Sequence, residues 1–572
     1  MKVFKKSVRK GYDMAFAKNQ RQQISMNDTT FGMTERNKRM MRKSWAESFS
    51  QDIFPRINED RFSVLYSGNA ASRPNTPVNV IIGLLLLKEL FNNTDDECMQ
   101  ELLFDIRYQY ALHTSSYKEQ PISDRTISRF RERLCWYEKE TGNDLMKEEM
   151  EAIANEFLKF LKINPGMKRM DSLMIASSCK KMGRMEILYH CVSDMAKAIN
   201  ATGEAGLLKG RLMRYLDPED ENDTLYRTTS EQTTSRLEEI ATDAFELLKI
   251  AGDGYRDLQE YKMLDRVIGD QIEETLEGLT LRPKKEISST SLQNPSDEDA
   301  TFRIKGGEKN KGYVGNIVET FDKNASIITS MDYEQNIHSD IDFCKTVIEA
   351  EPVHEEPITV VTDGAYGSEE TVALAKEKNI TLITTALIGK SPDQLLAEFI
   401  IDEVKHIIES CPAGQKPTDN NYRATTDCYS SHFNKSACLI CQHRKRCGVI
   451  FQKKRAIIRI TGNQIKRAKY LKQMSEPEYK KIANSRNAVE GIPSVMRRKY
   501  RVDEMPVRGY LRSKCWFFLK VGAINVKRVL AYTASLEFCT FLNNLFHHFQ
   551  FSRFNFQSYF KRSNFAFAKS CL

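Results

Sequence analysis

The chain has 572 residues, of which 41% are hydrophobic and 28% charged, which allows roughly two to four globular domains with cores of their own. Its longest apolar run, residues 80–87, is too short to cross a bilayer, and no apolar signal-peptide core follows the N-terminal lysines. Thirteen cysteines are too few for a disulfide scaffold, so we interpret them as thiols or metal ligands. These features argue against a membrane protein and favour a soluble protein of the cytoplasm.

The net charge of +8 is unevenly distributed. Residues 1–44 contain twelve Lys and Arg residues and three acids, a net charge of +9, whereas the rest of the chain is close to neutral. A second basic segment, residues 442–475, contains eleven Lys and Arg residues and no acid. Clustered positive charge favours a polyanionic partner, because each phosphate contact releases counterions. For residues 1–44, a disordered and solvated tail is an equally good interpretation.

Four helices are predicted between the basic tail and the first strand. The first is strongly apolar, and the second has Thr94 as its cap with Glu97 three residues on as the capping-box partner. Asn143 is a possible cap of the fourth. The predicted helices cover residues 79–91, 95–110, 123–134 and 144–162.

The third of these helices is rich in arginine. A small helical bundle whose last helix carries several arginines could bind DNA. The alternative is a bundle with a salt-bridged outer face, and this segment alone does not decide between the two. The arginines are Arg125, Arg129, Arg131 and Arg133, and the apolar residues beside them are Ile127, Phe130 and Leu134.

Apolar, β-branched runs predict a sheet in the middle of the chain. A first strand is followed by a long excursion that looks helical throughout, and then by two paired strands joined by a Lys-Asn turn. A helix, a strand, a helix and a strand follow, which predicts a mixed α/β sheet with helices on its faces. The elements are strand 168–175, helical stretch 186–280, strands 312–320 and 326–331, helix 340–350, strand 358–362, helix 368–378 and strand 380–386.

Asp363 stands directly after a predicted buried strand and before Gly364. A helix follows, with Ser368 as its cap. An acid between a buried strand and a helix lies at the carboxyl edge of a sheet, where ligands and metals collect in open α/β folds. Because Asp-Gly is also common turn chemistry, an ordinary turn is about as good an interpretation of this motif alone.

Asp171 and Asp363 both fall on predicted strands of this sheet. Two carboxylates on neighbouring strands suit Mg²⁺, and two such ions can bind both the attacking and the leaving oxygen of a phosphodiester. A third acid is usually needed, and Glu490 is the best candidate, with Glu504 as the fallback.

Arg486 and Glu490 are four residues apart, and Arg497 is seven beyond Glu490. On one continuous helix these three side chains would share a face, so that the acid could hold metal while the two arginines hold DNA phosphate. Pro493 interrupts that helix in the sequence and makes the phase between Glu490 and Arg497 uncertain. A plain Arg–Glu surface pair is the alternative.

A cysteine cluster is the most specific local signal. Cys438 and Cys441 are separated by two residues, Cys447 follows after five more, and Cys411 is the expected fourth member. Four thiolates in tetrahedral array would form a closed, structural Zn²⁺ site. The basic segment begins inside this cluster, so a zinc knuckle would present it to DNA. The spare ligand candidates are Cys428, His432 and His443.

Short motifs spread along the chain carry a family resemblance. They are residues 73–77 (RPNTP), 126–131 (TISRFR), 170–177 (MDSLMIAS), 297–301 (DEDAT), 311–313 (KGY), 362–367 (TDGAYG), 411–414 (CPAG), 438–441 (CLIC) and 486–490 (RNAVE). With these motifs, residues 61–530 resemble bacterial insertion-sequence transposases of the DDE type. The resemblance is closest to the branch with an N-terminal helical transposase domain and a cysteine-bearing insertion.

The resemblance implies an RNase H-like fold with Asp171, Asp363 and Glu490 as catalytic acids that bind two Mg²⁺ (or Mn²⁺) ions. Related transposases carry Tyr, Arg, Glu and Lys around the last acid. Arg486 and Glu490 fit that signature, Arg497 stands in the place of the lysine, and the tyrosine is replaced by Ala483. This last difference puts the contact of the tyrosine with the terminal base in doubt, but not the metal site.

The predicted organisation is an α/β, RNase H-like mixed-sheet core with a helical N-terminal domain, a helical insertion and a zinc-knuckle-like insertion. The aromatic tail fits no part of this scheme: it could pack on the body, bind DNA or be the altered end of a reading frame. The predicted domains are 1–44 (basic flexible tail), 45–162 (helical DNA-binding domain), 163–395 (core, with the helical insertion at about 186–290), 396–475 (cysteine-rich basic insertion), 476–537 (core completion with the third acid) and 538–572 (aromatic basic tail).

The expected function is that of a DNA transposase, which cuts and joins strands at the terminal inverted repeats of its element. Its partners would be double-stranded DNA, both repeat and target, and a second copy of the chain, because two ends must be joined at once. Arg129, Arg131, Arg486 and Arg497 would contact phosphate, and the protein would lie in the bacterial cytoplasm with the nucleoid. A metal-dependent nuclease on the same fold and a catalytically inactive, zinc-containing DNA-binding protein are the alternatives.

Overall fold

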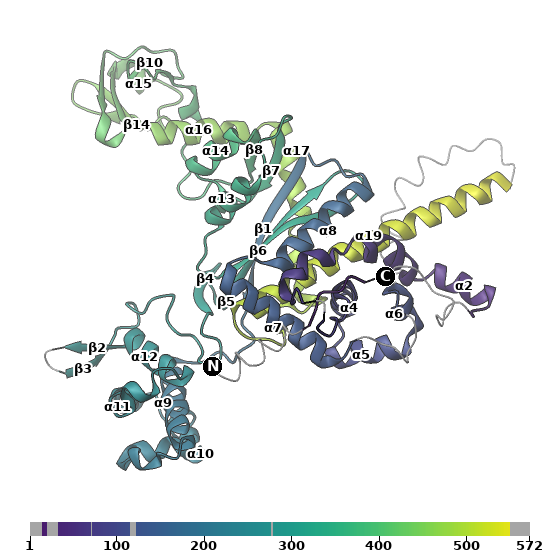
Figure 1. Ribbon diagram of the computed structural model, residues 1–572. Helices are drawn as coiled ribbons and strands as arrows, with labels where there is room; N and C mark the ends of the chain where they lie inside the picture. Colours follow the sequence, from purple (N-terminus) through teal and green to yellow (C-terminus); the bar gives the residue numbers. More distant parts are fainter. Residues whose placement is uncertain (1–13, 20–31, 70, 115–121, 276–277, 549–572) are drawn as a thin grey trace.

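The computed structural model describes residues 14–19, 32–69, 71–114, 122–275 and 278–548, with side chains as far as Leu536. Figure 1 shows a central sheet with helices packed around it and two lobes that project from it. One lobe is formed by residues 184–281 and the other by residues around 395–465. The described chain is therefore a mixed α/β fold with a helical N-terminal region, as the sequence predicts.

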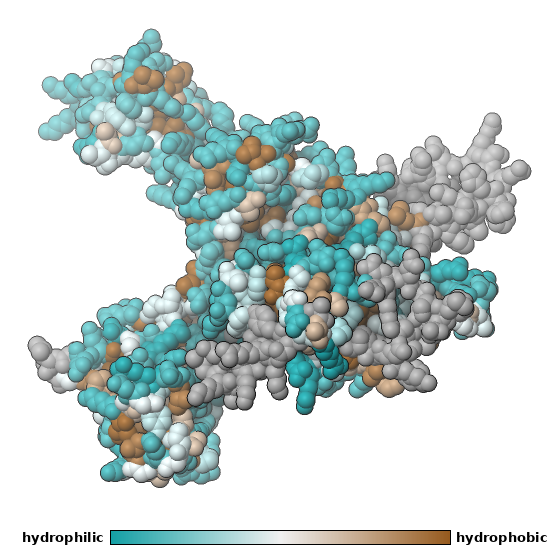
Figure 2. Space-filling model, viewed as in Figure 1, coloured by the Kyte–Doolittle hydropathy of each residue, from teal (hydrophilic) through white to brown (hydrophobic). Residues whose placement is uncertain are grey.

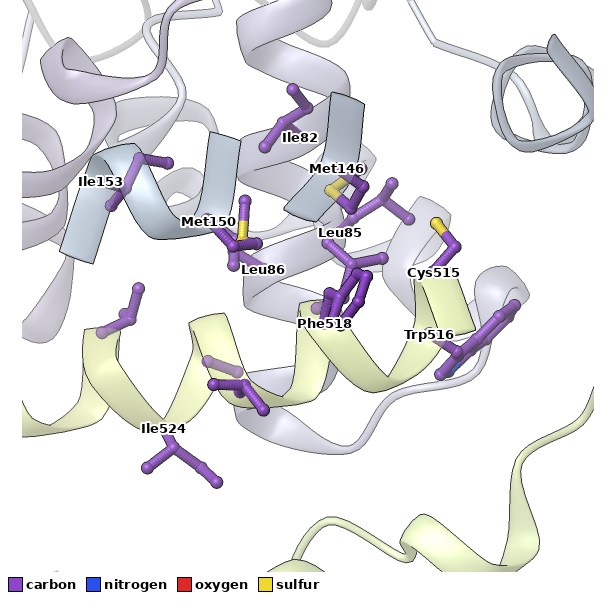
Figure 3. Close-up of a cluster of buried hydrophobic side chains, with 14 of the residues drawn as sticks. Ile82, Leu85, Leu86, Met146, Met150, Ile153, Cys515, Trp516, Phe518 and Ile524 are labelled. Atoms are coloured by element: carbon purple, nitrogen blue, oxygen red, sulfur yellow. The ribbon is translucent and has the colours of Figure 1, made fainter. Parts of the chain in front are cut away.

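The N-terminal region is built around α4, of whose fourteen residues twelve are buried. A helix that is apolar on all sides must be surrounded by other elements. Figure 3 shows its Ile82, Leu85 and Leu86 among side chains of α8 and the long helix α19 (Tyr510–His548). The helices of this region are α2 (Glu35–Arg42), α3 (Trp45–Ser48), α4 (Val78–Phe91), α5 (Asp95–Phe104), α6 (Ile106–Ala111), α7 (Asp124–Thr141) and α8 (Leu145–Leu161).

Three details of this region differ from the sequence prediction. Part of the expected flexible tail is regular structure, since α2 lies in it and Ala15 bridges to two loop residues of the domain. The helix predicted over 95–110 is divided at Asp105, whose side chain caps α6 by accepting from the Arg107 N–H. The cap of α8 is Asp144 rather than Asn143, because the Asp144 carboxylate accepts from the Lys147 N–H at 2.9 Å.

The central sheet is mixed, as predicted. The strand β1 pairs antiparallel with β5 and parallel with β7, and β7 pairs parallel with β8. On the other side, β5 pairs antiparallel with β6 and, at its beginning, with β4. The strands are β1 (Met167–Ala176), β4 (Thr301–Lys305), β5 (Glu308–Phe321), β6 (Ser326–Gln335), β7 (Ile358–Thr362) and β8 (Ile380–Thr384).

The two faces of the sheet are covered by different helices. Met170 and Met174 of β1 belong to a core shared with α13 (Asp340–Ala350) and α14 (Glu369–Glu377). Leu173 and Ile175, which alternate with them, belong to the large core formed with α8 and α19. Because successive strand residues point to opposite faces, odd-numbered residues of β1 share one face and even-numbered residues the other.

The first projecting lobe has a hydrophobic core of its own. Its four helices interrupt the chain between β1 and the rest of the sheet, as the sequence predicts. The prediction that residues 186–280 are helical throughout is wrong at its end, where Ile272 to Leu281 form a two-stranded hairpin. The elements are α9 (Arg184–Ala201), α10 (Pro218–Leu225), α11 (Thr233–Ala251), α12 (Gln259–Gln271), β2 (Ile272–Thr275) and β3 (Gly278–Leu281).

The second lobe is a small β-rich unit, also with a separate core. From it α16 leads back to the central sheet, where its Tyr470 and Met474 pack near Val361 and Ile383. Two short helices, α17 (Pro477–Ala483) and α18 (Gly491–Arg498), then lead to α19. The lobe contains β9 (Ile400–Asp402), β10 (Ile407–Ser410), β11 (Asp419–Arg423), β12 (Cys428–Phe433), α15 (Lys435–Leu439), β13 (Ile450–Phe451), β14 (Ala456–Thr461) and the start of α16 (Gly462–Met474).

The face of the molecule in Figure 2 is mostly hydrophilic, with apolar residues in small separate patches over both lobes and the body. Among the helices of the described segments, none has the length and apolar character needed to span a membrane.

Candidate active site

Asp171 lies on β1, and Asp363 directly follows β7, the parallel neighbour of β1. The pairing of these two strands ends at Arg169 and Val361, each two residues before one of the acids. Neighbouring strands are about 4.8 Å apart, and paired residues point to the same face. Both predicted acids therefore lie near the edge where β7 ends and leaves β1 without a partner on that side.

The Asp171 carboxylate is largely buried and closely held. Its Oδ1 accepts from the backbone N–H of Ser172 and from Nη2 of Arg486, both at 3.0 Å. Burial raises the pKa of Asp171 above its ordinary value, while the positive charge of Arg486 and these hydrogen bonds oppose that rise.

The Asp363 side chain caps a short 3-10 turn that follows β7. Its Oδ1 accepts from the Gly364 N–H at 2.6 Å. The buried Tyr366, two residues after Gly364, donates to Oδ1 of Asn316 on β5 at 3.1 Å. This hydrogen bond anchors the turn to the sheet. Asp363 thus caps a turn and also lies at the carboxyl end of a sheet strand, the two interpretations that the sequence left open.

Arg486 connects Glu490 to the first acid. Its Nη1 donates to Oε1 of Glu490 at 2.6 Å, and its Nη2 to Asp171. Arg486 itself is buried, whereas the Glu490 side chain is 56% exposed, as a carboxylate available to a ligand should be. Arg486 therefore bridges two carboxylates of the predicted set, those of Asp171 and Glu490.

The continuous helix expected from Arg486 to Arg497 is wrong. Arg486 lies in a 3-10 helix over residues 484–488, and α18 starts afresh at Gly491. Pro493 does not break α18, because it occupies the first turn, where backbone N–H groups have no helical partner.

Arg497 is consequently tied to other groups than Glu490. Its Nε forms an ion pair with Asp503 at 3.1 Å, and its Nη2 donates to the Met174 carbonyl of β1 at 2.8 Å. Its phosphate contact stays a prediction. Glu504, the fallback acid, lines a different cavity of about 520 Å³ together with Lys88 and Trp516.

The two N-terminal arginines expected to contact phosphate have different surroundings. Arg129 is exposed on α7. Arg131 is 13% exposed, forms a two-pronged ion pair with Asp95 at 2.6 and 3.0 Å, and lies 4.0 Å above the Trp516 ring. The structure gives the Arg131 guanidinium intramolecular partners, and its phosphate contact stays a prediction.

The four cysteines of the predicted zinc site line one cavity of about 170 Å³ in the second lobe, together with His443. Burial raises the pKa of the Cys438 thiol, and the other three thiols add to this effect as thiolates would. By distance, no group of three or more His, Cys, Asp or Glu side chains among the residues that the structure describes is arranged to hold a metal ion. Cys428, a spare candidate, instead lies on β12 with its thiol toward the Tyr429 carbonyl.

One set of polar residues beside Asp171 was missed in the sequence. Ser172 donates to Oδ1 of the buried Asp340 at 2.8 Å, and Lys305 donates to Ser172 at 3.1 Å. In the sequence, Asp340 looks like an ordinary acid in the first turn of a helix. Lys305 precedes a Gly-Gly pair between two alternating segments, which indicates a hairpin but not its place in the fold.

Comparison with protein families supports the resemblance found in the sequence. Residues 410–530 match the family model described as Transposase DDE domain, and residues 41–133 match that described as Transposase domain (DUF772). These two matches support the prediction of a DDE-type transposase of insertion sequences. The first match includes the cysteine cavity and Glu490, and a DDE transposase domain implies an RNase H-like core. No curated protein and no solved structure matches the chain.

Proposed function

We propose that this transposase relative cuts and joins DNA strands at the terminal inverted repeats of an insertion sequence, with Asp171, Asp363 and Glu490 as its catalytic acids. The observation that supports this most is the contact of Arg486 with both Asp171 and Glu490, together with the position of Asp363 directly after β7, the parallel neighbour of β1. Arg486 and Asp171 are 315 residues apart in the chain, so their contact is made by the tertiary fold and not by local structure.

The three acids suit a pair of Mg²⁺ or Mn²⁺ ions. They offer only carboxylate oxygens, which are the ligands that these ions prefer, and Glu490 is exposed enough to receive one. Bound there, two ions would supply the charge that stabilises the attacking and leaving oxygens of a phosphodiester. Arg486 would hold Asp171 and Glu490 in place and balance their charge.

The proposed reaction has two in-line steps at phosphorus. Water first attacks the phosphorus at the element's end, the P–O3′ bond breaks, and the strand leaves with a free 3′-hydroxyl. That hydroxyl then attacks a phosphorus of target DNA, forming a new P–O3′ bond and releasing a 3′-hydroxyl of the target. The same acids would serve both steps.

The N-terminal helices and the basic segments would bind the inverted repeats, chiefly through phosphates. Arg129 is suited to this role by its exposure. Two copies of the chain would act together because two ends must be joined, and the DNA would be that of the bacterial nucleoid.

The decisive experiment uses a labelled duplex carrying the inverted repeat that flanks the gene, with Mg²⁺ or Mn²⁺. We expect metal-dependent nicking and joined product from the intact chain, and loss of both in Asp363→Asn with DNA binding retained. Asp253→Asn, at a site 83% exposed in the helical lobe, is the matched control and should keep both activities.

The other outcomes separate the alternatives. Cleavage without joining of pre-cut ends would point to a nuclease on the same fold. Binding without any cutting would point to an inactive DNA-binding protein. Cleavage that survives alanine at all three acids would show that the site is elsewhere.

We also propose that Cys411, Cys438, Cys441 and Cys447 hold one structural Zn²⁺. The support is that all four thiols line the same small cavity, and sulfur is the preferred structural ligand of zinc. Purified protein should contain about one zinc per chain by elemental analysis. Cys441→Ser should lose the zinc and Cys428→Ser should keep it; protein that binds no zinc after reconstitution would refute the site.

A further inference from the structure

The hairpin of β4 and β5 carries a lysine into the neighbourhood of the proposed catalytic acids. Its two strands are joined by Gly306 and Gly307, whose φ angles of +60° and +84° suit a two-residue hairpin turn. Residues 304–309 at its tip are exposed. Lys305 is the last residue of β4, directly before this turn.

The lysine is held in place by two residues next to Asp171. The Lys305 ammonium donates to Oγ of Ser172 at 3.1 Å and lies 3.5 Å from Oδ2 of Asp340. Asp340 is only 5% exposed, and its other oxygen accepts from Ser172. Ser172 directly follows Asp171 in β1, so the ammonium lies beside the strand segment that carries the first proposed acid.

The ion pair with Asp340 does not use the full hydrogen-bonding capacity of the Lys305 ammonium. The Lys305 side chain is 42% exposed, and an ammonium has three N–H donors, of which the two contacts occupy at most two. At least one donor is therefore left for a further acceptor. A DNA strand whose phosphate reaches Asp171 and Asp363 would pass within the reach of this flexible side chain.

The other cations near the acids are already engaged. Both amino groups of Arg486 bind carboxylates, and Arg497 binds Asp503 and the Met174 carbonyl. A site that draws in a negatively charged backbone needs positive charge near the cut, since phosphate contacts provide much of the affinity for DNA. Lys305, with its partly exposed ammonium, is a cation of the described chain whose position suits that need.

We propose that Lys305 binds a backbone phosphate beside the cut, positioned by Ser172 and Asp340. The proposal rests on the function proposed above and adds a DNA-contacting residue on an element that carries none of the catalytic acids. It assigns to the β4–β5 hairpin the task of holding the DNA strand against the sheet edge.

The test measures binding, so that it stands apart from the test of catalysis. The full chain binds duplexes of the flanking inverted repeat in Ca²⁺, each with one neutral methylphosphonate in place of a phosphate near the cut. Intact chain, Lys305→Met, Lys305→Arg and Lys309→Met are compared. Lys309→Met is the matched control, because Lys309 is exposed on the other strand of the same hairpin.

We expect Lys305→Met to bind the unmodified duplex roughly tenfold more weakly and to reduce the salt slope of binding by about one. At one methylphosphonate position the intact chain should bind the modified duplex more weakly than the unmodified one. Lys305→Met should bind these two duplexes equally well. Lys305→Arg should restore binding, and Lys309→Met should behave as the intact chain. Thermal melting identifies any loss that is only structural.

Two results would overturn the proposal. One is equal sensitivity of the intact chain and Lys305→Met at every methylphosphonate position. The other is loss of affinity in Lys305→Met that matches Lys309→Met. Absence of cleavage by the intact chain would count against the proposed function but leave this binding result readable.

Discussion

Replacing Glu319 by Gln should destabilise the protein more than any ordinary surface change of the same kind. Glu319 lies on β5 with no exposed surface, and its two oxygens bind two arginines. Arg169 of β1 is the close partner of Oε2, and Nη2 of Arg528 from α19 is 2.7 Å from Oε1. The substitution would leave both guanidiniums without their counter-charge.

The size of the effect follows from burial. Removing one partner of a buried ion pair costs about 3–5 kcal/mol, because the remaining charge stays poorly solvated. The Arg528 side chain is 25% exposed and can reach water, whereas that of Arg169 is 9% exposed and cannot. We therefore expect a loss near the lower end, about 3 kcal/mol.

The change should also reach the proposed catalytic site. Arg169 donates to the Ser485 carbonyl at 2.7 Å, directly before Arg486, which holds Asp171 and Glu490. Cleavage by Glu319→Gln should therefore fall even where the protein is still folded.

Urea unfolding followed by far-ultraviolet circular dichroism measures the stability. The control is Glu398→Gln, since Glu398 pairs with Lys472 at 3.3 Å with both side chains about half exposed. A pair of this kind contributes at most about 1 kcal/mol. If Glu319→Gln lost no more stability than Glu398→Gln, the argument from the buried charge would be refuted.

Three further predictions follow from particular contacts. Burial alone would raise the pKa of Glu319, but Arg528 and Arg169 hold it below its usual value. The stabilisation that the ionised Glu319 contributes is therefore present above a pH of about 4.5 and is lost as the pH falls through the lowered pKa. The difference in urea midpoint between the intact chain and Glu319→Gln should narrow in that acidic range, and a constant difference would contradict this. Gly312→Ala should cost about 1–3 kcal/mol in the same assay, because φ is +142° and the new Cβ would stand 2.4 Å from a backbone oxygen of β1; an unchanged midpoint would contradict it. Arg129→Ala should weaken DNA binding and reduce its salt slope by about one without lowering the melting temperature, whereas Arg131→Ala should lower the melting temperature; the reverse pattern in binding titrations and melting curves would refute the distinction.

Much of the fold was predictable from local pattern. The apolar run of α4 predicted a buried helix, and the β-branched run before Asp363 predicted a strand of a covered sheet. Local rules were less successful at helix boundaries, where neighbouring residues compete for the same cap. Asp144 rather than Asn143 caps α8, and Asp105 ends one helix and begins the next.

The candidate site divides in the same way. The sequence by itself determined which residue types could bind metal ions or DNA. Acids that follow strands and a cluster of cysteines have this chemistry wherever the fold places them. The sequence also established the relation to DDE transposases, which the family matches support. The sequence did not determine which side chains contact one another. Helical periodicity predicts which residues share a face only as long as the helix is continuous.

Tertiary structure alone decided the partners. The break between residues 488 and 491 sends Arg497 to Asp503 and leaves Arg486 with Glu490 and Asp171. The pairing of β4 with β5 and the start of α13 bring Lys305 and Asp340 to Ser172, across gaps of 133 and 168 residues. Contacts over such separations depend on strand register and packing of the whole sheet, which no local pattern of residues encodes.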